Sequence, residues 1–293
     1  GSADITVADF FTGMFSSNIT QTFADGNILQ TVVIAILLGV AILRMKNPEH
    51  KEKAIKGMNV LNDIVFSLIN MIMLVSPIGV FFLMGDSFGK YGAGIFTSMA
   101  TLVGTYYLAC LVHVVLVYCT VIWVTAGINP LKFLKDSAEL WVYTISTCSS
   151  VAAIPINIKV AKEKFNVPET ISGFTVPLGS QMNYDGSVIL YGCVILFISQ
   201  TIGVPVTLGT MVKIILMSAI LSTGGGGIPG SGIVKLLVMV TAFGLPTEIV
   251  GIIAAFYRLF DMGTTTNNCL GDLAGPVFVS KLEDKAAARA KSA

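Results

Sequence analysis

The chain has 293 residues, of which 54% are hydrophobic and only 12% are charged, and its formal net charge is +1. A soluble domain carries about 25% charged residues. This composition, with a mean hydropathy of +0.81, therefore argues against an ordinary soluble protein and predicts a chain embedded in a lipid bilayer. The near-neutral charge argues against nucleic acid as a partner.

Long apolar stretches occur five times along the chain. They run over about 29–43, 64–84, 95–125, 171–202 and 249–279. Each can hold a membrane-spanning helix of about 20 residues. The last two contain polar residues and glycines, so we predict that these two helices are interrupted.

Two shorter apolar regions, about 138–158 and 212–240, break at small residues in "STCSSVAAIPIN" and "STGGGGIPGSG". About 10–14 apolar residues before such a break are too few to cross a bilayer, which favours re-entrant hairpins. Unpaired backbone groups are costly in hydrocarbon. The tips of both hairpins are therefore predicted to be buried in protein or to line a wet cavity.

Lysine and arginine residues are concentrated in loops on one side of the predicted spans. These loops and the C-terminal segment contain Arg44, Lys46, Lys51, Lys53, Lys56, Lys132, Lys135, Lys159, Lys162, Lys164, Lys281, Lys285, Arg289 and Lys291. The loops on the other side hold Lys90 and Lys213. Because basic residues accumulate in cytoplasmic loops, the C-terminus is predicted to be cytoplasmic, with both hairpins re-entering the membrane.

A weak internal repeat joins each hairpin to the apolar stretch that follows it. The first hairpin precedes a stretch carrying Asn183 and Asp185, and the second precedes one carrying Asn268 and Asp272. A hairpin plus an interrupted helix thus occurs twice, with opposite entry sides. Inverted repeats of this kind are typical of secondary transporters, whose binding sites lie at the interrupted segments.

Three carboxylates, Asp185, Asp261 and Asp272, lie inside the predicted spans. A charge in a span is costly and faces the protein interior or a cavity. Hydroxyl and amide side chains at 264–268 surround them, and oxygen ligands of this kind suit hard monovalent cations. Half-helix N-termini supply N–H groups for an anion. The sequence therefore predicts a site for both cations and an anionic group.

Other polar side chains in the spans are interpreted as structural. His113 lies alone in an apolar run, and Arg258 is spaced to form a helical salt bridge with Asp261. Single serines and threonines can equally serve as hydrogen-bonding groups between helices, and that alternative stays open for them.

The polar segments occur in the order of a known transporter family. They are the tip Ser149-Ser150 with Ile154-Pro155, "PLGSQMNYDGS", "STGGGGIPGSG" and "DMGTTTNNCLGD". In these motifs the chain resembles the dicarboxylate/amino acid:cation symporter family, which includes glutamate and neutral amino acid transporters. The resemblance implies an all-α, polytopic membrane protein of elevator type, with two re-entrant helical hairpins and two interrupted helices in inverted repeat.

The resemblance also implies a domain organisation. The chain corresponds to the C-terminal two-thirds of such a protein, with the family's first three helices outside it. Residues 1–125 would form part of a trimerisation scaffold and a connecting helix, and 126–293 the transport core. The core would comprise hairpin 1 (about 130–160), a broken helix (about 170–202), hairpin 2 (about 208–243), a last helix (about 247–280) and a cytoplasmic tail. A homotrimer in the cell membrane is expected.

The resemblance implies a set of sodium ligands, residue by residue. One sodium ion would bind Asp272 and the carbonyls of Gly179, Asn183 and Asn268. A second would bind the carbonyls of Gln181, Ser222, Thr223 and Gly225. The side chains of Asn183 and Asp185 would serve a third, completed by the family's third helix. Sodium is the expected coupling ion, with protons as an alternative, and no other cofactor is expected.

The resemblance places the substrate beside the last helix. Asp261 would hold the substrate ammonium group, and the Asn268 amide would hold its α-carboxylate. Further contacts are expected from Thr264, Thr265, Ser149, Ser150, Ser187, Ile228 and Gly230.

Three positions depart from the family pattern. Tyr184 replaces a methionine that packs beside the second sodium site. Thr264 and Cys148 stand where acidic-substrate members have an arginine. Because a buried carboxylate without a cationic partner is costly, the sequence predicts a small neutral amino acid such as serine, threonine or alanine. An acidic amino acid or dicarboxylate is the alternative, with Arg258 as its partner.

An alternative function, from another class of protein, is that of an intramembrane aspartyl protease. Its Gly-x-Gly-Asp motif is similar to "CLGD" at 269–272, but Cys269 occupies the place of the first glycine. Such a protease also has no use for two re-entrant hairpins or for Asp261. The sequence therefore favours a transporter over an enzyme.

Overall fold

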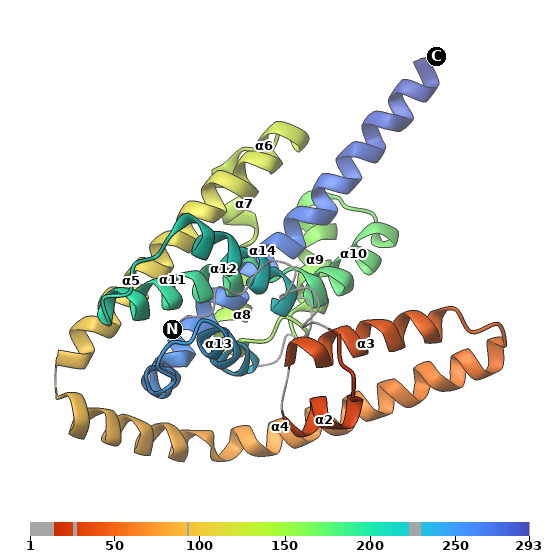
Figure 1. Ribbon diagram of the computed structural model, residues 1–293. Coiled ribbons are helices and arrows are strands. Elements are labelled where there is room, and N and C mark those ends of the chain that lie inside the picture. Colours follow the sequence, from red (N-terminus) through yellow and green to blue (C-terminus); the bar gives the residue numbers. More distant parts are fainter. Residues whose placement is uncertain (1–14, 26–27, 93, 223–229, 293) are drawn as a thin grey trace. The chain divides into compact units, whose positions relative to one another are not determined.

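The computed structural model describes residues 15–25, 28–92, 94–222 and 230–292. Within these ranges all regular secondary structure is helical and there is no strand, which confirms the predicted all-α class. The chain divides into two compact units, residues 1–85 and 86–293. Each unit is described by itself (Figure 1).

The described residues of the first unit form α2 (Ile19–Ala24), α3 (Ile28–Leu43) and the larger part of α4 (Pro48–Tyr91). The Asn18 side chain caps α2 by accepting a hydrogen bond from the backbone N–H of Gln21, which satisfies one of the free donors at the start of a helix. The long apolar runs of the sequence thus become long helices, as predicted.

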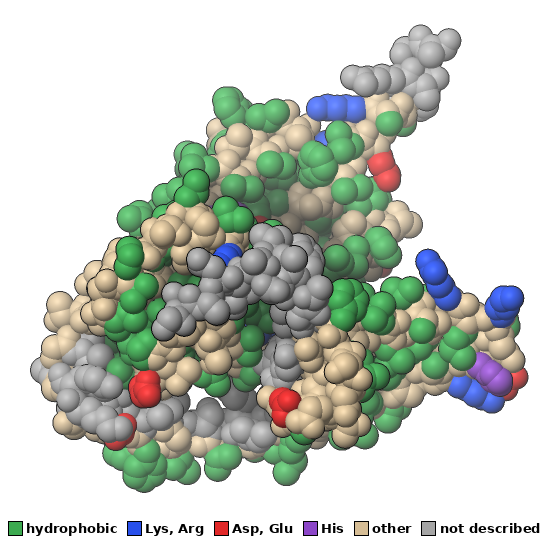
Figure 2. Space-filling model, in the orientation of Figure 1, with side chains coloured by type: hydrophobic (Ala, Val, Ile, Leu, Met, Phe, Trp, Pro, Cys, Tyr) green, Lys and Arg blue, Asp and Glu red, His purple; other side chains and the backbone are tan. Residues whose placement is uncertain are grey.

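Both long helices of this unit expose large apolar side chains, among them Leu37, Leu74 and Phe81. Basic side chains gather where α3 turns into α4, and Figure 2 shows them at that turn beside hydrophobic side chains. Exposed apolar surface along whole helices is unusual for a soluble monomer. It fits the lipid environment that the composition predicts.

The second unit begins with an almost continuous helical run. It consists of α5 (Gly94–His113), a π-helical segment η1 (Val114–Cys119) and α6 (Thr120–Ala126). Gly127, with φ of 67°, ends the run in the left-handed conformation, which glycine adopts without steric cost. The run packs against α11 and α14, which are described below. Single π-turns of this kind are frequent at functional sites.

The first predicted hairpin is a pair of short helices, α8 (Ala138–Thr147) and α9 (Ile154–Phe165), preceded by α7 (Pro130–Asp136). Cys148, with φ of 51°, ends α8 in the left-handed region. The helices α8 and α9 contact each other. The serine-rich segment therefore forms the connection between two helices, as the sequence indicates.

The interrupted helix predicted at about 170–202 is confirmed. The chain forms α10 (Glu169–Met182) and α11 (Asp185–Thr201), separated by Asn183 and Tyr184. Asn183 is extended, with φ of −94° and ψ of 103°. The break leaves the last carbonyl groups of α10 and the first N–H groups of α11 without partners inside a helix.

The second predicted hairpin also consists of two helices, α12 (Leu208–Ser222) and α13 (Ser231–Ala242), which contact each other. Its tip, residues 223–229, lies outside the described residues, and so do the predicted site residues Thr223, Gly225 and Ile228. Because α12 and α13 contact each other and Gly230, directly before α13, is left-handed with φ of 81°, the region is not one straight helix.

The last helix differs from the prediction. It is a single helix, α14 (Glu248–Ser292), that continues through the polar segment and through the expected tail (Figure 1). The Thr266 hydroxyl donates to the Met262 carbonyl one turn earlier at 2.8 Å, so this polar side chain is satisfied without a break. A Cβ on Gly271 would lie 2.3 Å from Asn183 Nδ2. This glycine therefore serves close packing and does not interrupt the helix.

Two helical stretches of the described chain, Thr97–Ala126 and Glu169–Thr201, are long and apolar enough to cross a membrane. A hydrophobic core in the second unit joins several of its helices. Fully buried members include Ile122 of α6, Leu140 of α8 and Leu273 of α14. This core holds α14 in place and thereby positions the polar residues that its middle turns carry.

Candidate functional site

A small pocket lies in the second unit between the end of α8 and the helices α11, α13 and α14. It is lined by Cys148, Ser150, Tyr184, Ser187, Tyr191, Ser231, Gly232, Lys235, Tyr257, Asp261, Thr264, Thr265 and Asn268. Six of these residues are sequence-predicted substrate ligands: Ser150, Ser187, Asp261, Thr264, Thr265 and Asn268. The fold thus gathers residues that are up to 118 positions apart, from Ser150 to Asn268.

Asp261 is the buried carboxylate of this pocket. Its side chain is 6% exposed, and its Oδ2 atom accepts a hydrogen bond from the backbone N–H of Gly230 at 3.1 Å. In the described chain no ion pair joins it to Arg258, whose guanidinium instead donates to the Ser146 carbonyl at 2.9 Å. The predicted helical salt bridge is therefore wrong, because Arg258 is exposed and turns toward the first hairpin.

Two further predicted substrate ligands are tied to their neighbours by hydrogen bonds. The Thr264 hydroxyl lies 2.7 Å from the hydroxyl of Tyr106. The Asn268 side-chain oxygen accepts from the backbone N–H of Gly186 at 2.8 Å. Since the amide oxygen of Asn268 is engaged, its NH₂ group is the end that can donate to a ligand.

Ser149 and Gly230 border the pocket without lining it. The Ser149 hydroxyl accepts from the Ala152 N–H at 3.2 Å, within the turn between α8 and α9. Gly230 adopts the left-handed conformation, with φ of 81°, immediately before α13. Its N–H points at Asp261 as described above, so the second hairpin reaches the pocket through its backbone.

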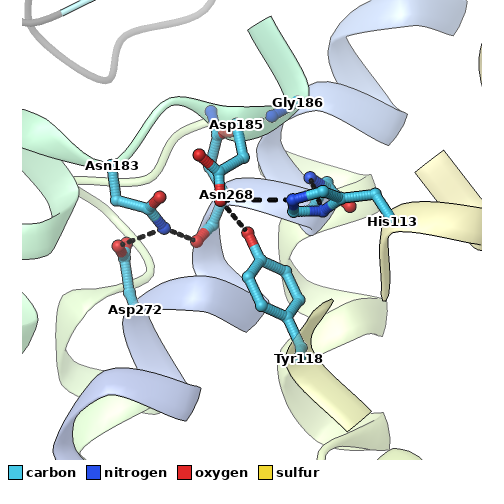
Figure 3. Close-up of polar contacts among 8 residues, drawn as sticks. His113, Tyr118, Asn183, Asp185, Gly186, Asn268 and Asp272 are labelled. Atoms are coloured by element: carbon cyan, nitrogen blue, oxygen red, sulfur yellow. Dashed lines mark hydrogen bonds and ion pairs between the residues drawn. The ribbon is translucent and has the colours of Figure 1, made fainter. Parts of the chain in front are cut away.

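A second polar cluster joins the helix break to α14 (Figure 3). The Asn183 amide donates to the Asn268 carbonyl at 2.8 Å and to Asp272 Oδ1 at 3.1 Å. Gly179 approaches so closely that an added Cβ would lie 2.5 Å from Asp272 Oδ1. Four residues predicted around one sodium ion are therefore neighbours in the structure.

Asp272 is the buried carboxylate of this cluster. Its side chain is 3% exposed, and its Oδ2 atom is buried without a hydrogen-bond partner among the described residues. A buried carboxylate oxygen without a partner is energetically costly. A bound cation is the simplest group that would satisfy it.

Asp185 lies at the other side of the break, where Figure 3 shows two side chains of the α5–η1 run pointing at it. Tyr118 donates a hydrogen bond to Asp185 Oδ2 at 2.7 Å. His113 Nε2 lies 3.6 Å from the same oxygen, and His113 Nδ1 lies 3.4 Å from the Asn267 amide.

Sequence reasoning missed this arrangement. The sequence pattern indicated a structural role for His113 and no role for Tyr118. The available signal was the imidazole itself, because a polar ring inside an apolar helix needs a polar partner.

The described residues of the predicted second sodium site have an unexpected neighbour. The Lys235 ammonium donates to the Ser222 carbonyl at 3.4 Å and lies 4.5 Å from the centre of the Tyr184 ring. Gln181 is exposed at the end of α10. Sequence reasoning missed Lys235 as well, although a single lysine within an apolar helix is a functional candidate by default.

Comparison with known proteins places these observations in context. The model of the sodium:dicarboxylate symporter family matches residues 2–282. A proton/sodium-glutamate symport protein of Bacillus subtilis is 30% identical over 278 residues, which are 95% of this chain and 64% of the relative.

C4-dicarboxylate transport proteins are also similar. That of Rhizobium etli is 28% identical over 96% of this chain and 62% of its own length. That of Deinococcus radiodurans is 28% identical over 96% of this chain and 63% of its own length. The chain thus spans less than two thirds of the length of these relatives, all of which are named as transporters.

Proposed function

The chain belongs to the sodium:dicarboxylate symporter family, and from that premise we propose that it forms the substrate- and ion-binding part of a membrane symporter. The transported molecule is a small carboxylate-bearing substrate, an acidic amino acid or a dicarboxylate, and sodium ions or protons drive its uptake. The observation that carries the proposal is the pocket that Asp261, Thr265 and Asn268 line, together with the buried Oδ2 atom of Asp272, which has no hydrogen-bond partner among the described residues.

Each polar group of the pocket has a chemical task in this proposal. Asp261 pairs with the ammonium group of an amino acid substrate, because a buried carboxylate needs a cationic partner. A dicarboxylate lacks this group, so Asp261 favours the acidic amino acid over the dicarboxylate. The NH₂ group of Asn268 and the Thr265 hydroxyl donate hydrogen bonds to a substrate carboxylate. The backbone N–H of Gly230 donates to Asp261 Oδ2 at 3.1 Å and thereby joins the second hairpin to this carboxylate.

Cation binding is proposed at the helix break. The free Oδ2 atom of Asp272 supports a sodium ion there, held also by carbonyl groups of Gly179, Asn183 and Asn268. Asp185, with Tyr118 and His113 beside it, is a second candidate for a cation or a proton. A cation bound between the break and α14 would hold the two together, which is how ion binding would be coupled to substrate binding.

The relatives and the pocket indicate two candidate substrate classes. The names of the relatives support an acidic substrate. A neutral amino acid is the second candidate, because Cys148 and Thr264 place a thiol and a hydroxyl in the pocket where an arginine would grip a second carboxylate. The exposed Arg258 hydrogen-bonds outside the pocket. An acidic substrate would therefore need another cationic or hydrogen-bonding partner.

The membrane arrangement is proposed on the same basis. We infer that α8 with α9, and α12 with α13, are re-entrant hairpins that gate the site from opposite sides. Residues 1–125 then belong to the scaffold of a homotrimer and 126–293 to a transport core that moves as an elevator, with the C-terminus cytoplasmic. The basic residues at the α3–α4 turn and in α14 support this orientation.

Uptake by reconstituted vesicles tests the proposal. Labelled glutamate, aspartate, succinate and serine are offered under an inward sodium gradient, an inward proton gradient and no gradient. Gradient-driven uptake of an acidic substrate is expected. Stronger uptake of serine would favour a neutral amino acid as the substrate. An uptake rate that is the same with a sodium gradient, with a proton gradient and without a gradient would refute coupled transport.

A further inference from the structure

Lys235 supplies the positive charge of the pocket between α8, α11, α13 and α14. Of the described residues that line this pocket, only Lys235 is cationic and only Asp261 carries a carboxylate. The Lys235 side chain is 7% exposed, and within the described part of the chain it forms no ion pair. Because a buried ammonium group without a counter-charge is costly, the pocket favours an anion beside Lys235.

The packing of α13 holds this ammonium group at the pocket. Ser231, Gly232 and Lys235 all line it, and residues three and four positions apart in a helix lie on the same face. Gly232 approaches α14 so closely that an added Cβ would lie 2.0 Å from the Tyr257 hydroxyl oxygen. The face of α13 that carries Lys235 is therefore the face that packs against the site.

The described contacts of Lys235 leave its charge unneutralised. Its Nζ atom donates to the Ser222 carbonyl at 3.4 Å, which is longer than the usual 2.9–3.0 Å, and a lysine ammonium group has three donors. The Tyr184 ring lies 4.5 Å from the same nitrogen and attracts a cation through its π-electrons. Both partners are neutral groups, so the ammonium group keeps its full charge and N–H donors that an anion could use.

Lys235 and Asp261 line one pocket without pairing with each other. Opposite charges arranged in this way suit a ligand that itself carries both signs of charge. In the proposed function Asp261 meets the substrate ammonium group, and Asn268 with Thr265 meets the α-carboxylate. Lys235 then remains for a second carboxylate, which is the group that distinguishes an acidic amino acid from a neutral one.

We propose that Lys235 binds the side-chain carboxylate of an acidic amino acid and thereby makes the transporter select this substrate over neutral amino acids. The inference rests on the proposed symport function. Cys148 and Thr264 provide no positive charge in the pocket, so Lys235 is the cationic partner that an acidic substrate needs. A neutral substrate would fill the pocket and leave the ammonium group without a counter-charge, which penalises it relative to aspartate.

Binding of aspartate and asparagine to the full-length protein tests the inference. The two ligands have nearly the same shape, but asparagine has an amide in place of the second carboxylate. Their dissociation constants are measured at saturating sodium in wild type, Lys235→Met and Lys213→Met. Methionine nearly keeps the length of the lysine side chain and removes its charge. Lys213 lies exposed on α12 of the same hairpin, so its substitution controls for the loss of a lysine as such.

Wild type is expected to bind aspartate more tightly than asparagine. In Lys235→Met the ratio of the two affinities should fall by about thirtyfold or more, because a buried charge pair loses one partner. Lys213→Met should keep the wild-type ratio. An equal loss of affinity for both ligands in Lys235→Met would indicate a structural role and overturn the inference, and so would an unchanged ratio.

Two results would separate the inference from the proposed function. Sodium-driven uptake by a wild type that prefers asparagine would overturn the inference and leave symport intact. Uptake of no amino acid or dicarboxylate under any gradient would refute the proposed function itself.

A measurement on the wild type covers the case in which Lys235→Met does not fold. A crystal structure of the full-length protein with bound aspartate should place a side-chain carboxylate oxygen about 2.7–2.9 Å from Lys235 Nζ, the usual length of such a charged hydrogen bond. A bound aspartate whose side-chain carboxylate contacts other groups and not Lys235 would overturn the inference.

Discussion

The two helical segments that carry the polar residues present ligand groups to the site in different ways. Between α10 and α11 the helix breaks at Asn183 and Tyr184, so backbone groups become available at the site. In α14 the helix continues through Asp261, Asn268 and Asp272 and presents mainly side chains, together with the carbonyl of Asn268. A broken segment can thus offer carbonyl ligands to cations, whereas the intact helix offers carboxylates and amides in a rigid register.

The largest effect is expected from the carboxylate that the intact helix presents to the substrate. Asp261→Ala should weaken substrate binding by about 3–5 kcal/mol, a hundredfold or more, because the substrate ammonium would be buried without a partner. Equilibrium binding of labelled substrate measures the loss. Asp284→Ala, on the same helix but exposed, is the matched control and should bind normally. Comparable binding by both variants would remove Asp261 from the substrate site.

The next effect concerns the contact between the two segments. Asp272→Asn should weaken sodium binding by about 1.5–3 kcal/mol, because a neutral amide is a poorer partner for a cation than a carboxylate. A sodium titration of substrate binding measures the shift. Asp185→Asn is the comparison, and a smaller shift is expected because the Asp185 side chain is 41% exposed. An unchanged sodium titration in Asp272→Asn would show that the ion binds elsewhere.

The close approach of the two segments can be tested through stability. Gly186→Ala should lower the free energy of unfolding by about 1–3 kcal/mol, because its Cβ would lie 2.6 Å from the Thr264 carbonyl oxygen. Gly192→Ala, six residues later in α11, meets nothing within 4 Å. It should leave stability unchanged or raise it by up to about 1 kcal/mol. Thermal unfolding in detergent compares the two, and equal melting temperatures would mean that α11 and α14 are further apart.

The smallest expected effect is a change in selectivity. Thr264→Arg should shift the affinity ratio of aspartate to serine toward aspartate by about tenfold, because a guanidinium group can donate two hydrogen bonds to a second substrate carboxylate. Competition by each amino acid against one labelled substrate measures the ratio. Thr264→Leu controls for the loss of the hydrogen bond to Tyr106. A ratio equal in Thr264→Arg and wild type would place the substrate side chain away from this residue.

The prediction of the helix break and the failure to predict the continuity of α14 have a common cause. Asn183 and Asp185 lie beside a glycine, and there the polar cluster does mark the end of one helix and the start of the next. The cluster at 264–268 looks similar in the sequence but forms regular helix. Thr266 is satisfied within the helix, but Thr264 and Asn268 bond to groups far away in the chain, the Tyr106 hydroxyl and the Gly186 N–H. A local pattern does not contain those partners.

The sequence by itself determined the helical class, the apolar surface, the two pairs of short helices and the residues of the polar segments. These depend on composition and on short-range periodicity, which any stretch of the chain carries within itself. The tertiary structure alone decided that His113 and Tyr118 meet Asp185, that Arg258 donates to the Ser146 carbonyl, and that Lys235 reaches the Ser222 carbonyl and the Tyr184 ring. Such pairings depend on how helices pack. A buried polar group takes whichever partner the packing brings within reach, because leaving it unpaired costs more than any local preference.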